Sequence, residues 1–177
     1  MIRSRLFLLL LAALVLTGCG FHLRNRIALP ADVGPVRVAS SGMYSELTTH
    51  LTRGLQAAGA ELAPEPEAGL PVPPAATLRI VSERWGDLPI AVDQYGRSQE
   101  YSLRYAVIFS FKRADGSDLV PQQVVEMSRD YVSQPDNATG TTTEREVLAR
   151  ELRREMAASI LRRIDGVVRT GQAAPAP

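Results

Sequence analysis

The chain has 177 residues, one cysteine, two histidines and a formal net charge of +1. This length suits a single domain with one hydrophobic core. A net charge this close to zero excludes binding to nucleic acid through a large excess of basic residues. A single cysteine excludes a framework of disulfide bonds within the chain.

Residues 1–18 have the layout of a secretory signal peptide. Arg3 and Arg5 form a positive n-region, residues 6–16 are an unbroken apolar run, and small residues precede Cys19. The apolar run is about half the length that a helix needs to cross a bilayer. We therefore expect a cleaved export signal, not a membrane-spanning anchor.

The four residues that end at Cys19, Leu-Thr-Gly-Cys, match the bacterial lipobox. This resemblance implies a diacylglycerol thioether on Cys19, cleavage after Gly18 and a third acyl chain on the freed amine. Two or three acyl chains give stable anchoring where one is marginal. Gly20 stands where an aspartate retains enteric lipoproteins in the inner membrane, so we expect the outer membrane. The cleaved chain would carry a net charge of about −1.

Residues 19–31 are expected to form a lipidated tether, followed by a single periplasmic domain over residues 32–168. A β-prone segment at residues 33–39 opens this domain. Apolar residues at spacings of three and four then predict an amphipathic helix over residues 43–58.

Ser41 is the expected N-cap of this helix and Gly59 its C-cap, while Gly54 inside it favours close packing. Five prolines within residues 64–74 predict an extended connector after the helix.

From Thr77 the pattern becomes that of β-strands, with an interruption expected at residues 85–87. Tyr95-Gly96 predicts a tight hairpin, because glycine supplies the positive φ. Residues 98–112 alternate most clearly, and a second hairpin at Asp115-Gly116 leads to a strand over residues 119–132. The alternation separates two faces, one apolar (Tyr101, Leu103, Tyr105, Val107, Phe109, Phe111) and one polar (Glu100, Ser102, Arg104, Ser110, Lys112).

Pairing around the first hairpin would place Ile90 opposite Tyr101 and Leu88 opposite Leu103, so both strands would bury the same face. The other face is expected to expose Ala106, Ile108 and Trp85 among polar residues. Such a face indicates either a docking surface or a surface covered by the proline-rich connector.

The last predicted helix begins at a capping box, Thr143 to Glu146, and has one apolar stripe as far as Val168. Residues 169–177 read as a disordered tail. The element order β-α-β-β-β-α predicts an α+β fold: a two-layer α/β sandwich with two helices on one face of a four-stranded mixed sheet.

The sequence offers little catalytic chemistry. The histidines, His22 and His50, have no second metal ligand near them in the sequence, and no nucleophile motif or phosphate-binding loop occurs. Three acidic residues lie near the first hairpin: Asp87, Asp93 and Glu100. Acidic side chains are common in turns and at sheet edges because water solvates them there, so we do not interpret them as a catalytic carboxylate pair. We predict a non-enzyme with no metal and no cofactor beyond the lipid on Cys19.

The segment Cys-Gly-Phe-His-Leu-Arg at residues 19–24 is similar to the opening of the lipopolysaccharide-assembly lipoproteins of the LptE family. The resemblance continues at Gly96, at Glu100-Tyr101 and at Pro135, and the element order agrees. It implies a plug inside the outer-membrane barrel LptD that helps this barrel to assemble and supports lipopolysaccharide delivery to the outer leaflet.

The family is further proposed to bind lipopolysaccharide through basic residues near the tip of the sheet. This sequence departs from that pattern: it has Gln94 where the family leads us to expect an arginine, and Thr141 where it leads us to expect a lysine. The candidate lipopolysaccharide site is therefore Arg97 with Gln94 and Tyr95, and the alternative is a solvated turn arginine. The alternative function is an accessory or pilot lipoprotein of another outer-membrane barrel or secretin; a lipoprotein enzyme ranks third.

Overall fold

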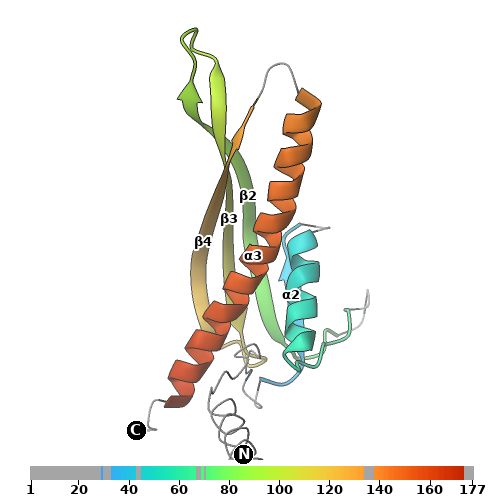
Figure 1. Ribbon diagram of the computed structural model, residues 1–177. Helices are drawn as coiled ribbons and strands as arrows, with labels where there is room; N and C mark the ends of the chain where they lie inside the picture. The colour runs from blue at the N-terminus through green and yellow to red at the C-terminus, as the bar shows by residue number, and fades with distance from the viewer. Residues whose placement is uncertain are drawn as a thin grey trace, which may run out of the picture.

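The computed structural model describes residues 29, 33–42, 45–66, 69, 71–133 and 138–173. Its elements are β1 (Val36–Ser40), α2 (Glu46–Ala57), β2 (Ala76–Val92), β3 (Ser98–Lys112), β4 (Asp118–Val132) and α3 (Ala138–Ala173). The strands form one sheet in sequence order, with β1 parallel to β2 and the other pairs antiparallel. Both helices lie on the same face of the sheet (Figure 1). The predicted order and two-layer mixed-sheet fold are confirmed.

The core lies between the helices and the face of β3 that the alternation identified. Every second side chain of β3 from Leu103 to Phe111 is fully buried. Both helices bury their apolar stripes against this face, because the sheet and each helix have only one apolar side to cover. The fully buried helix residues are Leu47, Leu51 and Leu55 of α2 and Leu152, Met156, Ile160 and Ile164 of α3.

The pairing register of β2 with β3 differs from the prediction by one residue. Leu88 pairs with Ser102 and Asp87 with Leu103, and irregularities interrupt the ladder between Ile80 and Ser82 and again beside Ile90. A slip of one residue moves a side chain to the other face of the sheet. Leu88 and Ile90 are therefore exposed, where the sequence had predicted them to be buried.

The expected interruption at residues 85–87 is wrong, because β2 runs straight through them. The irregularity lies at Val81 instead, and it reverses the faces of the residues that follow. Trp85 consequently lies on the helix face and not on the open face. Its ring stacks on Tyr105 with 3.8 Å between centroids, and the Arg153 guanidinium lies 5.1 Å from its centroid.

The start of α2 also differs from the prediction. The N-cap is Ser45, not Ser41, and its side chain makes no capping hydrogen bond. The Ser45 hydroxyl instead donates to the Glu83 carboxylate (2.7 Å), and the Ser41 hydroxyl donates to the Val81 carbonyl (3.2 Å). Both serine hydroxyls therefore bind β2 and do not cap the helix. The C-cap is Ala58, not Gly59; Gly59 follows it with a φ of +89°, the usual conformation of a glycine directly after a helix.

The last helix is longer than predicted at both ends. It begins at Ala138, so Thr143 lies inside it and is not a cap; its hydroxyl donates to the Thr139 carbonyl (3.0 Å). A threonine in a helix interior commonly makes such a bond one turn back. Residues 169–173, expected to begin a disordered tail, continue the helix. Among the described residues, no helix is both long and apolar enough to span a membrane.

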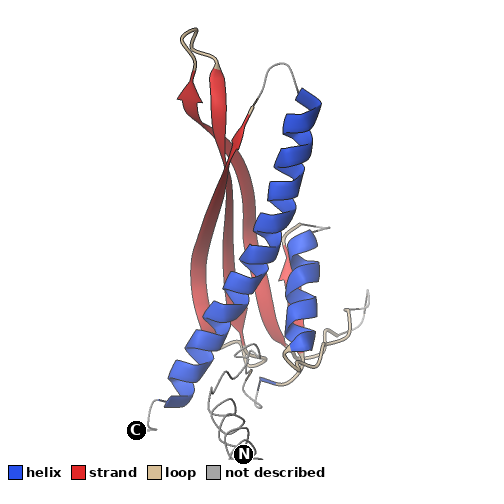
Figure 2. Cartoon of the chain, in the orientation of Figure 1, coloured by secondary structure: helices blue, strands red, loops and turns tan. Residues whose placement is uncertain are grey.

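The hairpin between β2 and β3 projects at one end of the sheet, away from β1 and α2 (Figures 1 and 2). The long α3 crosses the sheet diagonally, and its first turns lie at the same end of the molecule as this hairpin (Figure 1). This end therefore combines a projecting turn with the N-terminal turns of a helix.

Candidate functional site

The turn of the projecting hairpin contains all three residues of the predicted lipopolysaccharide site. Gln94, Tyr95 and Arg97 are exposed, and the Tyr95 side chain is the most exposed large apolar group described, at 74%. Gly96 has a φ of +76°, and its N–H donates to the Asp93 carbonyl (3.0 Å). The predicted hairpin and its glycine are confirmed. We call residues 93–97 the tip.

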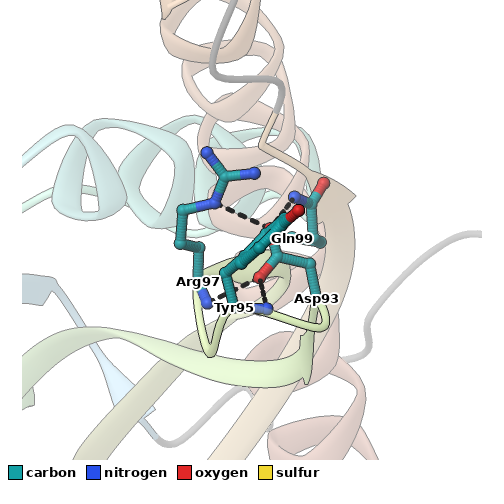
Figure 3. Close-up of polar contacts among 4 residues, drawn as sticks. All are labelled: Asp93, Tyr95, Arg97 and Gln99. Carbon is teal, nitrogen blue, oxygen red and sulfur yellow. Dashed lines mark hydrogen bonds and ion pairs between the residues drawn. The ribbon is translucent and has the colours of Figure 1, made fainter.

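The Asp93 carboxylate organises the tip (Figure 3). It accepts hydrogen bonds from the backbone N–H groups of Tyr95 (2.8 Å) and Arg97 (2.9 Å), from Arg97 Nε (2.7 Å) and from Gln99 Nε2 (3.3 Å). The backbone bond from Arg97, together with the other bonds to the charged form, lowers the pKa of Asp93 to about 2. From the sequence alone, Asp93 was expected to be only a solvated acidic residue of the turn.

The pairing with Asp93 defines what Arg97 can do. Its Nε is occupied, its guanidinium lies 5.4 Å from the Tyr95 ring centroid, and 61% of its side chain is exposed. Of the three guanidinium nitrogens, Nε is the one that a dashed line joins to the Asp93 carboxylate in Figure 3. A guanidinium held in this way still offers paired N–H donors to a phosphate or carboxylate. The ion pair nevertheless leaves the tip with little net charge.

Exposed apolar side chains lie on the strand that leads to this charge-balanced turn. Leu88, Ile90 and Val92 on the distal part of β2 are between 44% and 64% exposed. Exposed apolar groups that lie together at one end of a molecule are typical of an interaction site. The tip end is therefore amphipathic, with one cation among apolar groups. The sequence did not reveal this property, because it depends on the irregular pairing of β2.

A polar cluster supports the hairpin at its base. Arg145 of α3 binds the Asp87 carboxylate through Nε (2.9 Å) and Nη2 (2.7 Å), and the Tyr131 hydroxyl of β4 donates to the same carboxylate (3.1 Å). Hydrogen bonding from Arg145 lowers the pKa of Asp87, while desolvation and then the bond to Asp87 raise the pKa of Tyr131. The cluster ties α3 to two strands. No sequence motif connects these residues, because they come from three elements.

The remaining candidate residues lie at different places. Thr141 is half-buried in the first turn of α3. Lys112 lies at the opposite end of β3 from the tip and pairs with Asp118 (2.8 Å). Tyr101 stacks on Tyr131 with 5.6 Å between ring centroids. Only Arg97 among these candidates is a cation at the tip.

Several predictions fall on residues outside those the structure describes. They include the signal peptide over residues 1–18, the lipidation of Cys19, the motif at residues 19–24 and Pro135. Within the described ranges, no three histidine, cysteine or acidic side chains lie close enough to hold a metal ion.

Comparisons with known proteins agree with the resemblance. A family model described as "LptE: Lipopolysaccharide-assembly" matches residues 31–164. A relative named LPS-assembly lipoprotein LptE, from Photorhabdus laumondii, is 27% identical over 164 residues, which cover 92% of this chain and 86% of the relative. One of the same name from Yersinia enterocolitica is 28% identical and covers 92% and 76%.

Two solved structures share the fold. The rare lipoprotein B from Shewanella oneidensis has a TM-score of 0.65 at 22% identity, covering 78% of this chain and 99% of that one. A lipoprotein B from Nitrosomonas europaea has a TM-score of 0.64 at 20% identity, covering 86% and 94%.

Proposed function

The chain belongs to the LptE family of lipopolysaccharide-assembly lipoproteins, and on this basis we propose that it plugs the lumen of the outer-membrane barrel LptD, helps this barrel to assemble and supports lipopolysaccharide insertion into the outer leaflet. It acts through surface complementarity, without turnover. The observation that carries the proposal is the amphipathic tip. It projects beyond the sheet on a hairpin whose base is held by the contacts of Asp87 with Tyr131 and Arg145.

The open face of the sheet supports the same proposal. Exposed Arg84, Arg104 and Glu126 lie on this face beside Val124, which is also exposed, and the half-buried Ile108. The described contacts of the proline-rich connector are with β1 at the sheet edge, and no described element covers the centre of this face. A surface of mixed charged and apolar groups matches the composition of non-obligate protein interfaces.

We assign direct lipopolysaccharide contact to Arg97, with Gln94 and Tyr95 beside it. Asp93 holds the guanidinium by Nε and leaves the Nη groups to bind a lipid phosphate in bidentate fashion. Tyr95 and the apolar side chains around the tip suit the acyl chains. Because the charge of Arg97 is balanced by Asp93, this contact adds specificity more than long-range attraction.

The anchoring part of the proposal rests on the lipobox. Cys19 carries the acyl chains, residues 19–31 are the tether, and the domain works at the periplasmic side of the outer membrane or inside the barrel lumen. The lipid is the only prosthetic group that this role requires.

Native purification of the full-length lipoprotein from outer membranes tests the plug role. We expect a one-to-one complex with LptD that withstands detergent extraction. Isolation with a different barrel or with a secretin, and without LptD, would refute the plug role and favour an accessory or pilot lipoprotein.

A further inference from the structure

The first strand, β1, has a free outer edge with a defined backbone direction. The Pro35 carbonyl accepts from the Ala76 N–H (2.9 Å), and the Ser41 N–H donates to the Ile80 carbonyl (3.3 Å). The backbone groups of successive residues in a strand point to opposite sides. The odd-numbered residues of β1 therefore face β2, and the even-numbered residues face outward.

The chain itself pairs with the first of these outward positions. The Val36 N–H donates to the Glu61 carbonyl (2.8 Å), and the Ala63 N–H donates to the Val36 carbonyl (2.9 Å), in parallel pairing. After Ala63 this pairing stops. The next two outward positions, Val38 and Ser40, have no strand beside them within the described part of the chain.

A groove of about 400 Å³ runs along this free edge. Residues of β1 line it, Thr52 of α2 lines it from the helix layer, and Glu65 and Pro66 of the connector are also at its margin. Val38 lines this groove and is only half-buried. The groove therefore has an unpaired strand edge between a helix and a loop.

Contacts from Arg37 attach the connector at the edge of the sheet. Its Nη2 donates to the carbonyls of Pro64 and Pro73, each at 3.4 Å, so both ends of the proline-rich segment lie beside β1. The described connector residues are thus attached beside the groove at the edge of β1.

We propose that this edge binds an extended segment of the barrel partner as an additional parallel strand. The inference rests on the plug role proposed above and specifies one of its contacts. The N–H and C=O groups of Val38 and Ser40 would pair with the incoming backbone and continue the pairing that residues 61–63 begin. Addition of a strand to an exposed sheet edge is a recurrent mode of peptide recognition. The segment must be extended and must have N–H donors at alternate positions.

Val38→Pro in the full-length lipoprotein tests this contact, with Val38→Ala as its matched control. Proline removes the outward N–H and leaves the pairing with β2 intact, whereas alanine shortens the side chain and keeps the N–H. We expect the proline variant to bind purified LptD about tenfold more weakly and the alanine variant to bind within about twofold of the wild type. Thermal unfolding of both variants checks that they are folded.

Amide hydrogen exchange on the wild-type complex provides a second measurement that needs no variant. We expect exchange at Val38 and Ser40 to slow at least about tenfold on binding. Unchanged exchange at both amides, or wild-type affinity in a folded Val38→Pro variant, would overturn the edge contact and leave the plug role intact. If the wild-type chain forms no complex with LptD, the plug role itself fails, so the two failures are distinguishable.

Discussion

Val124 and Val125 of β4 are adjacent residues on opposite faces of the sheet, and aspartate at each position tests the face assignment. Val125 is 3% exposed and pairs with Val107 on the helix face, whereas Val124 is 58% exposed and pairs with Ile108 on the open face. The two substitutions are chemically identical. Their difference therefore isolates burial.

The expected magnitudes follow from that difference. Both variants lose strand propensity, which costs up to about 1 kcal/mol. Val125→Asp also loses about 1.5–3 kcal/mol of apolar burial and places a polar group in the core at about 1–3 kcal/mol more. We expect Val125→Asp to destabilise the fold by at least about 3 kcal/mol, and Val124→Asp by about 1 kcal/mol. The first value is a large fraction of the stability of a typical domain.

Urea unfolding of the full chain in mild detergent, followed by circular dichroism, measures both values. Val125→Asp should lower the midpoint strongly or abolish the cooperative transition, while Val124→Asp keeps a transition of unchanged slope. Equal destabilisation by the two variants would show that the helices do not cover the Val125 face. The open face would then be the wrong docking surface.

Four further predictions concern the anchor, the tip and its base. Cys19→Ala should abolish acylation, because only the thiol accepts diacylglycerol; palmitate labelling of the variant would contradict the lipobox assignment. Arg97→Gln should weaken lipopolysaccharide binding, and the wild-type advantage should shrink as salt rises, while Lys112→Gln at the other end of β3 has no effect. The pKa of Asp93 is lowered from 3.8 to about 2, so its ordering of the tip is complete above about pH 4 and is lost as pH falls through about 2. The Arg97 amide signal should show this by NMR, and loss of order at pH 5 would be inconsistent with it. Arg145→Ala should speed hydrogen exchange in the first turns of α3 and change global stability by less than about 1 kcal/mol; unchanged exchange would mean that the cluster does not hold the helix.

The order of elements and the faces of β3 were predictable because both depend on local patterns. Leu103 to Phe111 alternate without interruption, and the structure buries the side that the alternation chose. Gly54 was also interpreted correctly as a site of close packing. A Cβ at this position would collide with Leu161 of α3.

The register and the polar clusters were not predictable, since they depend on tertiary pairing. An extra residue at Val81 shifts the pairing by one and reverses the faces of Trp85 and Leu88, yet nothing in the local sequence marks Val81. The link between Asp87 and Arg145 spans 58 positions in the sequence. Such contacts arise only when the sheet and the helix are in place, so local spacing does not reveal them.

The position of α3 after the three long strands in the chain has a consequence for the time course of folding. The hairpins of β2, β3 and β4 join neighbouring segments and are able to form early, because short loops cost little closure entropy. The part of the apolar face that α3 covers then stays exposed to water until α3, which is synthesised after these strands, packs on it. A newly made chain thus passes through a stage in which the apolar face of the sheet is only partly covered, when association with other chains competes with folding. A chain that ends before α3 would stop at that stage and aggregate.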